Sequence, residues 1–350
     1  MAEKMELISF SEALDVSRRY STRHLLLGNG FSISCRPTIF VYGKLLERAN
    51  FASFSGQAQK AFAILGTQDF ERVIKVLADS SRVLEAYGAP DVLREQLAKD
   101  ASQLKEILVQ TLASSHPARP ADISDEEYSR CRQFLTGFGN IYTLNYDLLL
   151  YWAFMNRDQQ TLVSDDGFRK PQDDFESSYV TWEASQSHDQ NIWYLHGALH
   201  VFDSGTEVRK FTWKNTGVAL IDQIRDALRR NYFPLFVAEG TSDEKLERIR
   251  HSDYLAKAQR SFQSIKGALF IFGHSLAPND EHILKEIERG KLSHVFIGVH
   301  GNPDTEANKK LIARGQRLAL NRSGKNPLQC SFYISDTAFV WHEAEVELMK

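Results

Sequence analysis

The feature that most constrains this chain is a series of six or seven short apolar, β-branched or aromatic runs, several of which lead directly into a glycine-bearing or polar loop. The runs cover residues 24–27, 141–143, 192–195, 235–237, 268–272, 294–299 and 331–334. Continuous apolar runs of this length are typical of strands buried on both faces of a parallel sheet. We therefore expect an α/β fold with a mostly parallel sheet of about six strands, flanked by helices.

Polar residues and glycines gather in the loops that follow these runs. Gly28, Asn145, His196 and Gly273 each come directly or almost directly after a run. In open parallel sheets the ligand crevice forms outside the carboxyl ends of the strands. We therefore expect a Rossmann-like sheet whose functional loops all lie on one edge.

Residues 38–138, between the first two runs, show the apolar spacing of helices. Phe70, Val73, Ile74 and Leu77 recur every three or four positions, as on one face of a helix. We expect at least three helices, forming a helical insertion at 45–137 within a single domain that spans 1–350. Residues 114–124 form a loop between two of these helices, and the polar segment 164–190 covers or borders the functional edge.

Composition excludes several classes of partner. A net charge of -3 over 350 residues gives no basic field for nucleic acid, and no apolar run approaches the length of a membrane span. The N-terminal residues are charged and lack the apolar core of a signal peptide, so we expect a cytoplasmic protein. Cys35, Cys131 and Cys330 lie far apart without a C-x-x-C pair, so we expect no disulfide framework and no metal.

The first motif follows the first strand and consists of Gly28, Asn29, Gly30, Phe31 and Ser32. Glycines let backbone amides approach a pyrophosphate closely, which makes these five residues candidates for dinucleotide binding. A three-glycine fingerprint would need glycine or alanine where Ile33 stands. An ordinary strand-to-helix turn is therefore an equally good interpretation of this motif alone.

The second motif alternates Thr143, Asn145 and Asp147 after the next strand. Residues two apart in an extended segment point to the same side, so these side chains can face one pocket. Thr143 is then a candidate for binding, and Asn145 and Asp147 for catalysis. The alternative is an Asx turn in which Asn145 and Asp147 cap the following helix.

Two further strand ends carry candidate residues. His196 precedes Gly197 and is a candidate general base, although histidines at such positions are more often structural and His200 competes for the role. In the later motif, Gly273 lets the backbone approach a ligand and Ser275 can bind a phosphate or ribose oxygen. The alternative there is a plain strand-to-helix connection with Asp280 as the N-terminal charge of the helix.

The order of these motifs resembles the sirtuin-like superfamily, in particular its bacterial members. Each of four motifs follows a predicted strand, over about residues 20–300: Gly-x-Gly-x-Ser, Thr-x-Asn-x-Asp, His-Gly and Gly-x-Ser. Residues 234–240 also look like the strand that precedes the last nucleotide loop of that superfamily. The resemblance implies that Gly28, Gly30 and Ser32 hold dinucleotide phosphates and that Gly273 and Ser275 border the adenosine half. It implies that Asn145 lies beside the nicotinamide ribose and that His196 is catalytic, with Asp147 as the acidic residue of the motif.

The resemblance also implies a reaction, with NAD as substrate. Deacylating members carry a zinc ribbon with two C-x-x-C pairs, which this chain lacks, so the implied activity is hydrolysis of NAD to nicotinamide and ADP-ribose. Similar NAD glycohydrolases are effectors of anti-phage defence, which implies a latent enzyme switched by homo-oligomerisation or by an operon-encoded sensor. A non-catalytic nucleotide-binding or signalling module of the same fold is the main alternative, and a deacylase or ADP-ribosyltransferase is the third.

Overall fold

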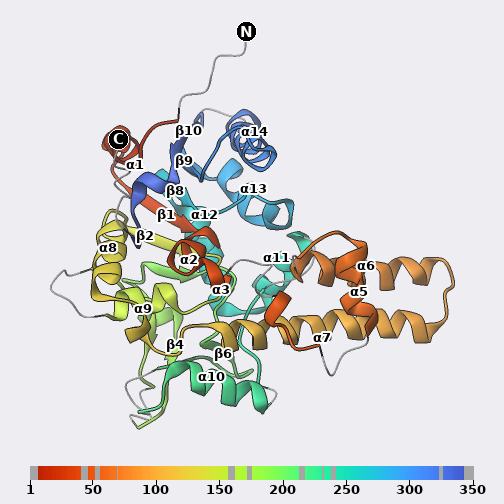
Figure 1. Cartoon of the computed structure of the whole chain (residues 1–350). Helices are drawn as coiled ribbons and strands as arrows, with labels where there is room; N and C mark the ends of the chain where they lie inside the picture. Colours follow the sequence, from red (N-terminus) through yellow and green to blue (C-terminus); the bar gives the residue numbers. More distant parts are fainter. Residues whose placement is uncertain are drawn as a thin grey trace, which may run out of the picture.

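The centre of the molecule is a six-stranded sheet in which every neighbouring pair of strands is parallel (Figure 1). The computed structural model describes residues 7–40, 46–51, 56–68, 70–156, 162–171, 176–212, 217–230, 232–237, 242–322 and 326–342. The strands are β1 (Arg23–Leu27), β2 (Asn140–Thr143), β5 (Ile192–Tyr194), β8 (Lys266–Phe272), β9 (Lys291–Val299) and β10 (Gln329–Ile334). The predicted α/β fold with a mostly parallel sheet is confirmed.

The strand order places a crevice at the middle of the sheet. The order is β10-β9-β8-β1-β2-β5, so the chain adds β2 and β5 on one side of β1 and then β8, β9 and β10 on the other. This is the order of the doubly wound dinucleotide-binding fold, and its direction reverses between β1 and β8. The loops after β1 and β8 therefore leave the sheet side by side, and the chain then continues to opposite faces of the sheet.

Alternate side chains of the strands enter two separate cores. Leu25 and Leu27 of β1 belong to one, and Leu26 belongs to the other. Helices α1 (Phe10–Ser17), α8 (Asp125–Leu135) and α9 (Leu149–Met155) contribute to the first core. The second contains residues of α12 (Asp253–Ser264), α13 (Glu281–Arg289) and α14 (Glu306–Asn321). Both faces of the sheet are thus covered, as an all-parallel sheet requires.

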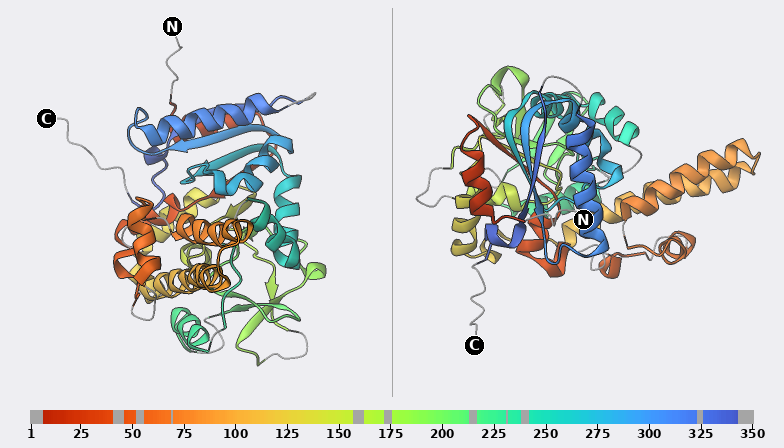
Figure 2. Two further views of the ribbon diagram at one scale, coloured as in Figure 1. Left: turned by 90° about the vertical axis from the view of Figure 1, so that its right-hand side faces the viewer. Right: turned by 90° about the horizontal axis from the view of Figure 1, so that it is seen from above.

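The segment predicted as a helical insertion is helical. It contains α5 (Gly56–Ile64), α6 (Phe70–Ala86), α7 (Asp91–Ser115), the short helix η1 (Pro120–Asp122) and α8. Helices α6 and α7 pack along each other as a hairpin that projects from the body (Figure 2). Two short helices, α2 (Gly30–Cys35) and α3 (Pro37–Phe40), precede the insertion. Within the described residues, no helix is both long and apolar enough to cross a membrane.

A second sheet was not predicted from the sequence. It is antiparallel, in the order β3-β4-β7-β6, and α10 (Leu220–Arg229) follows it in the chain. Its strands are β3 (Phe168–Arg169), β4 (Tyr179–Trp182), β6 (Val201–Asp203) and β7 (Val208–Phe211). The polar segment 164–190 thus supplies two strands and the short helix η2 (Ala184–Gln186).

The strand predicted at 235–237 is wrong, and residues 238–240 of the predicted strand and nucleotide loop lie outside the described residues. This extended segment makes one antiparallel bridge, between Phe236 and Gly197, and joins neither sheet. The N–H of Val237 donates to the carbonyl of His196 at 2.9 Å, and the N–H of Leu235 donates to Val201 at 2.7 Å. Phe236 and Val237 are buried because the segment packs across the end of β5. Helix α11 (Ser242–His251) comes next.

Candidate functional site

The loops after β1 and β8 are in contact where the sheet reverses direction. The N–H of Gly28 donates to the carbonyl of Phe272 at 2.9 Å, and the N–H of Gly30 donates to Gly273 at 2.8 Å. A Cβ added to Gly30 would lie 2.5 Å from the Cα of Gly273. The Gly-x-Gly motif is therefore needed for the approach of one loop to the other, whatever ligand lies above them.

Asn145, just beyond β2, is held by its amide nitrogen. Nδ2 donates to the carbonyl of Gly28 at 3.0 Å and to Oγ of Ser32 at 2.9 Å. Because a carbonyl can only accept, the bond to Gly28 fixes which end of the amide is nitrogen. Asn145 lines a cavity, and its amide oxygen is the atom left to meet a ligand there.

Ser32 and Asp147 support Asn145 from behind. The Ser32 hydroxyl donates to Oδ2 of Asp147, and Oδ1 of Asp147 accepts the N–H of Leu149 at 2.9 Å, at the start of α9. Burial raises the pKa of Asp147, although the bonds from Ser32 and Leu149 act in the opposite direction. Asp147 therefore both forms an Asx turn at the start of α9 and lines the cavity, so the two interpretations coexist for this residue.

His196 is fixed at the end of β5 by its neighbours. Gly197 has φ +78°, and a Cβ there would lie 1.9 Å from the carbonyl oxygen of Leu235, so the extended segment at 235–237 packs tightly on this turn. Nε2 of His196 lies 2.9 Å from Nε2 of His282, and the ring of Tyr146 lies nearly parallel at 6.5 Å. Burial, together with the charge of Lys245, holds the pKa of His196 well below its usual range. The ring is therefore neutral at physiological pH.

A buried ion-pair network lies next to the two histidines. Asp280, at the end of the short helix η3 (Pro278–Asp280), receives Lys245 Nζ at 3.1 Å on Oδ1 and His274 Nε2 at 3.0 Å on Oδ2. The N–H of Leu276 donates to Nδ1 of His274, so the His274 proton is on Nε2 and points at Asp280. Burial raises the pKa of Asp280, but His274 and Lys245 lower it more, to well below its usual range.

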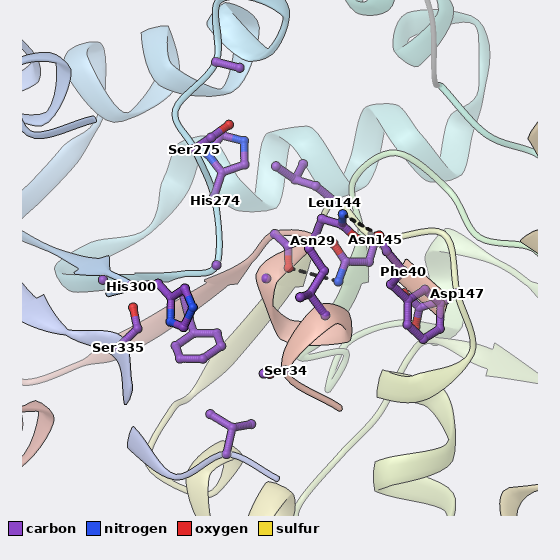
Figure 3. A pocket seen from close by; sticks show the side chains of 18 of the residues that line it. Asn29, Ser34, Phe40, Leu144, Asn145, Asp147, His274, Ser275, His300 and Ser335 are labelled. Atoms are coloured by element: carbon purple, nitrogen blue, oxygen red, sulfur yellow. Dashed lines mark hydrogen bonds between the residues drawn. The ribbon is translucent and has the colours of Figure 1, made fainter. Parts of the chain in front are cut away.

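These elements surround a cavity of about 990 Å³. Its volume lies at the upper end of the range for small-molecule sites. Asn145 and Asp147 lie on one side, the loop of His274 and Ser275 on another, and His300 and Ser335 on a third (Figure 3). Side chains from the ends of several strands therefore converge at one edge of the sheet.

Most of the predicted residues line this cavity. They are Gly28, Asn29, Gly30, Asn145, Asp147, His196, Gly273, Ser275 and Asp280. Three predicted binding residues lie behind its wall instead, because their polar atoms face other parts of the protein. Phe31 is buried and its carbonyl accepts Trp341 Nε1, Ser32 links Asn145 to Asp147, and Thr143 Oγ1 accepts the N–H of Asn145 at 3.0 Å.

One further expectation fails for the same cavity, and the competing histidine lies outside it. Within its described residues, the segment 164–190 contributes nothing to the lining, because it is occupied in the antiparallel sheet. His200, the competing histidine, is fully buried against the rings of Tyr151 and Tyr194 and lies outside the lining.

One known protein family matches nearly the whole length of the chain. The model of a domain of unknown function, DUF4917, matches residues 25–341. The chain belongs to the DUF4917 family. The DUF4917 match runs from β1 to Trp341 and so includes every strand end that borders the cavity. No curated protein matches the chain.

The sequence did not reveal several residues of this DUF4917 cavity. Phe40, Leu108 and Leu112 form part of its apolar wall, and most residues from Ser335 to His342 close another side after β10. Leu108 and Leu112 stand at helical spacing in the sequence, but spacing alone does not say what a helix face covers. His274 and His282 are neighbours in sequence of the predicted residues Gly273, Ser275 and Asp280. The position of His282, two residues after Asp280, was the one sequence signal for the buried network of histidines and ion pairs.

Proposed function

We propose that this DUF4917 chain is an NAD glycohydrolase that cleaves NAD to nicotinamide and ADP-ribose. The observation that carries the proposal is the convergence of Asn145 and His196, from two different strands, on the cavity beside the contact of Gly28 with Gly273. Independent strand ends meet at one point in few arrangements, so this geometry supports the sirtuin-like resemblance of the motifs.

The chemistry of the proposed reaction suits an amide and a neutral imidazole. Nicotinamide leaves NAD as a neutral molecule, so its departure needs no strong acid, and the sugar develops positive charge at C1′. An oriented water and a firmly held ribose are then the main requirements. The amide oxygen of Asn145 accepts a hydrogen bond from that water or from a ribose hydroxyl.

His196 and Asp147 take different parts in this proposal. His196 is neutral and reaches the cavity, so it exchanges a proton or a hydrogen bond with a ribose hydroxyl or with water, an effect typically worth about 10²–10⁴-fold. Both oxygens of Asp147 are already hydrogen-bonded within the protein. Asp147 therefore acts by holding Ser32, which holds Asn145.

The dinucleotide would lie across the point where the sheet reverses. In this proposal the nicotinamide ribose occupies the side of Asn145 and His196, and the adenosine half lies toward the loops after β9 and β10, where His300 and Ser335 line the cavity. The volume of about 990 Å³ accommodates a molecule of that size.

We further propose that the enzyme is a cytoplasmic effector of anti-phage defence that is nearly silent alone. An unregulated NAD hydrolase would exhaust a cofactor that its own cell needs, so activity must await homo-oligomerisation or an operon-encoded sensor. The hairpin of α6 and α7 supports this, because it offers surface that a minimal nucleotide-binding sheet does not need.

The test is nicotinamide release from NAD by the purified chain, alone and with the products of neighbouring genes. We expect Asn145→Ala and His196→Ala to lose at least about 10²-fold of the activity, while His188→Ala, at an exposed histidine, retains it. NAD binding without nicotinamide release under every condition would instead favour the non-catalytic module. Full activity of the chain alone would refute the proposed latency.

A further inference from the structure

The contact between two histidines determines which atom of His196 can meet a ligand. Nε2 of His196 lies 2.9 Å from Nε2 of His282, and the two rings stack with centroids 5.1 Å apart. Nε2 is therefore occupied. Nδ1 of His196 makes no hydrogen bond to any described residue, and His196 lines the cavity. Nδ1 is the ring nitrogen that remains for a ligand.

The surroundings of His282 determine which of the two Nε2 atoms carries the proton of the hydrogen bond between His196 and His282. Burial lowers the pKa of His282 to about 4 and holds that of His196 well below its usual range, so both rings are neutral and one donates to the other. Nδ1 of His282 is buried and has no partner among the described residues. A proton there would be an unpaired buried donor, which folded proteins tolerate less often than an unpaired acceptor. The His282 proton therefore belongs on Nε2.

We propose that His282 is a positioning residue that makes His196 a hydrogen-bond donor to the cavity ligand. Nε2–H of His282 donates to Nε2 of His196, which leaves the His196 proton on Nδ1, directed at a ligand oxygen. The identity of that oxygen rests on the proposed function: a ribose hydroxyl or the carboxamide oxygen of nicotinamide. His196 then enters the reaction as a donor, and it can accept a proton only after the two rings exchange tautomers.

A metal ion is the competing explanation for the same atoms. One potential ligand atom from each of His196, Asp280 and His282 lies within 4.8 Å of the others. However, both oxygens of Asp280 already have partners, and one of them is the ammonium of Lys245, whose side chain is 1% exposed. A divalent ion would share this single carboxylate with a buried cation, and the two positive charges would repel each other. The hydrogen-bonded pair is therefore favoured.

The experiment compares two variants of equal length, His282→Gln and His282→Glu. The amide of glutamine can still donate to Nε2 of His196, whereas the carboxylate of glutamate can only accept. Nitrogen-15 NMR of the full chain, with the His196 signals assigned by their loss in His196→Gln, reports which ring nitrogen carries the proton. Calorimetry reports the affinity for NAD, and urea unfolding shows that each variant is folded.

We expect the His196 proton on Nδ1 in the wild type and in His282→Gln, and on Nε2 in His282→Glu. Affinity for NAD should stay within about threefold in His282→Gln and fall about five- to 150-fold in His282→Glu, the range for leaving one buried polar group unpaired. A proton on Nε2 of His196 in the wild type overturns the proposal, as does a stoichiometric metal that both variants lose. The NMR measurement contains no nucleotide, so it judges His282 even where NAD proves not to be the substrate.

Discussion

Replacing Gly30 with alanine tests the contact between the loops after β1 and β8. The new Cβ would lie 2.5 Å from the Cα of Gly273, where ordinary contacts begin at 3.4 Å, so the loops must separate by about 0.9 Å. The atoms in the way belong to the backbone and cannot rotate aside. Overpacking of this kind costs about 1–3 kcal/mol. The separation would also stretch the 2.8 Å bond from Gly30 N–H to Gly273 beyond hydrogen-bonding range, at about 0.5–1.5 kcal/mol.

We therefore expect Gly30→Ala to lower the free energy of unfolding by about 2–4 kcal/mol, measured by urea denaturation. Gly56→Ala is the control, because a Cβ at Gly56 meets nothing within 4 Å. A domain stable by about 5–15 kcal/mol stays folded after such a loss, so the affinity for NAD can be measured in the same protein and should fall at least about tenfold. A difference between the two variants of less than about 0.5 kcal/mol would refute the steric argument.

Three further predictions concern the cavity wall and its supports. Asn145→Asp should destabilise the fold by about 1–3 kcal/mol in urea and abolish nicotinamide release, because a carboxylate cannot donate to the carbonyl of Gly28. Acid should destabilise the protein, because burial lowers the pKa of His116 from 6.5 to about 4 in the folded state. Between pH 6.5 and pH 4 the unfolded chain therefore binds a proton at His116 that the folded chain does not bind. The contribution of neutral His116 to stability is complete above pH 6.5 and is lost as the pH falls toward 4. That loss is worth roughly 3 kcal/mol, and His116→Gln should flatten the dependence of the melting temperature on pH. Trp341→Phe should lower the free energy of unfolding by about 1 kcal/mol, since the indole no longer donates to Phe31, and an unchanged value would show that the bond contributes nothing.

The parallel sheet could be predicted because its strands are buried on both faces. Residues 268–272 and 295–297 are apolar without interruption, and they form parts of β8 and β9. The antiparallel sheet carries no such signal, since β3 has two residues and the buried and half-buried positions of β4 and β7 mix apolar with polar residues. The segment 235–237 shows the opposite problem. It is as apolar as a strand, but its partner is a turn at Gly197 rather than another strand.

The part of the cavity wall that is formed by residues at the strand ends could be predicted from the sequence. Asn145, His196 and Gly273 follow parallel strands, so sheet geometry alone brings them to one edge. The contact of His196 with His282 joins residues 86 positions apart and depends on how α13 packs against the sheet. The hydrogen bond between Trp341 and Phe31 spans 310 positions. Such contacts follow from helix packing, which apolar spacing does not specify.

Helix α7 belongs both to the projecting hairpin and to the wall of the cavity, so a displacement of the hairpin would be transmitted along the helix to the cavity. The chain is anchored just beyond the helix at His116, where Nε2 accepts the N–H of Leu148 at 3.0 Å and the ring packs on Trp152. At about 1.5 Å per residue, Leu108 stands about 12 Å from His116 and Val92, at the exposed tip, about 36 Å. A rigid tilt that shifts the tip by about 6 Å therefore moves Leu108 by about 2 Å, and a force applied at the tip acts on the cavity wall about threefold amplified.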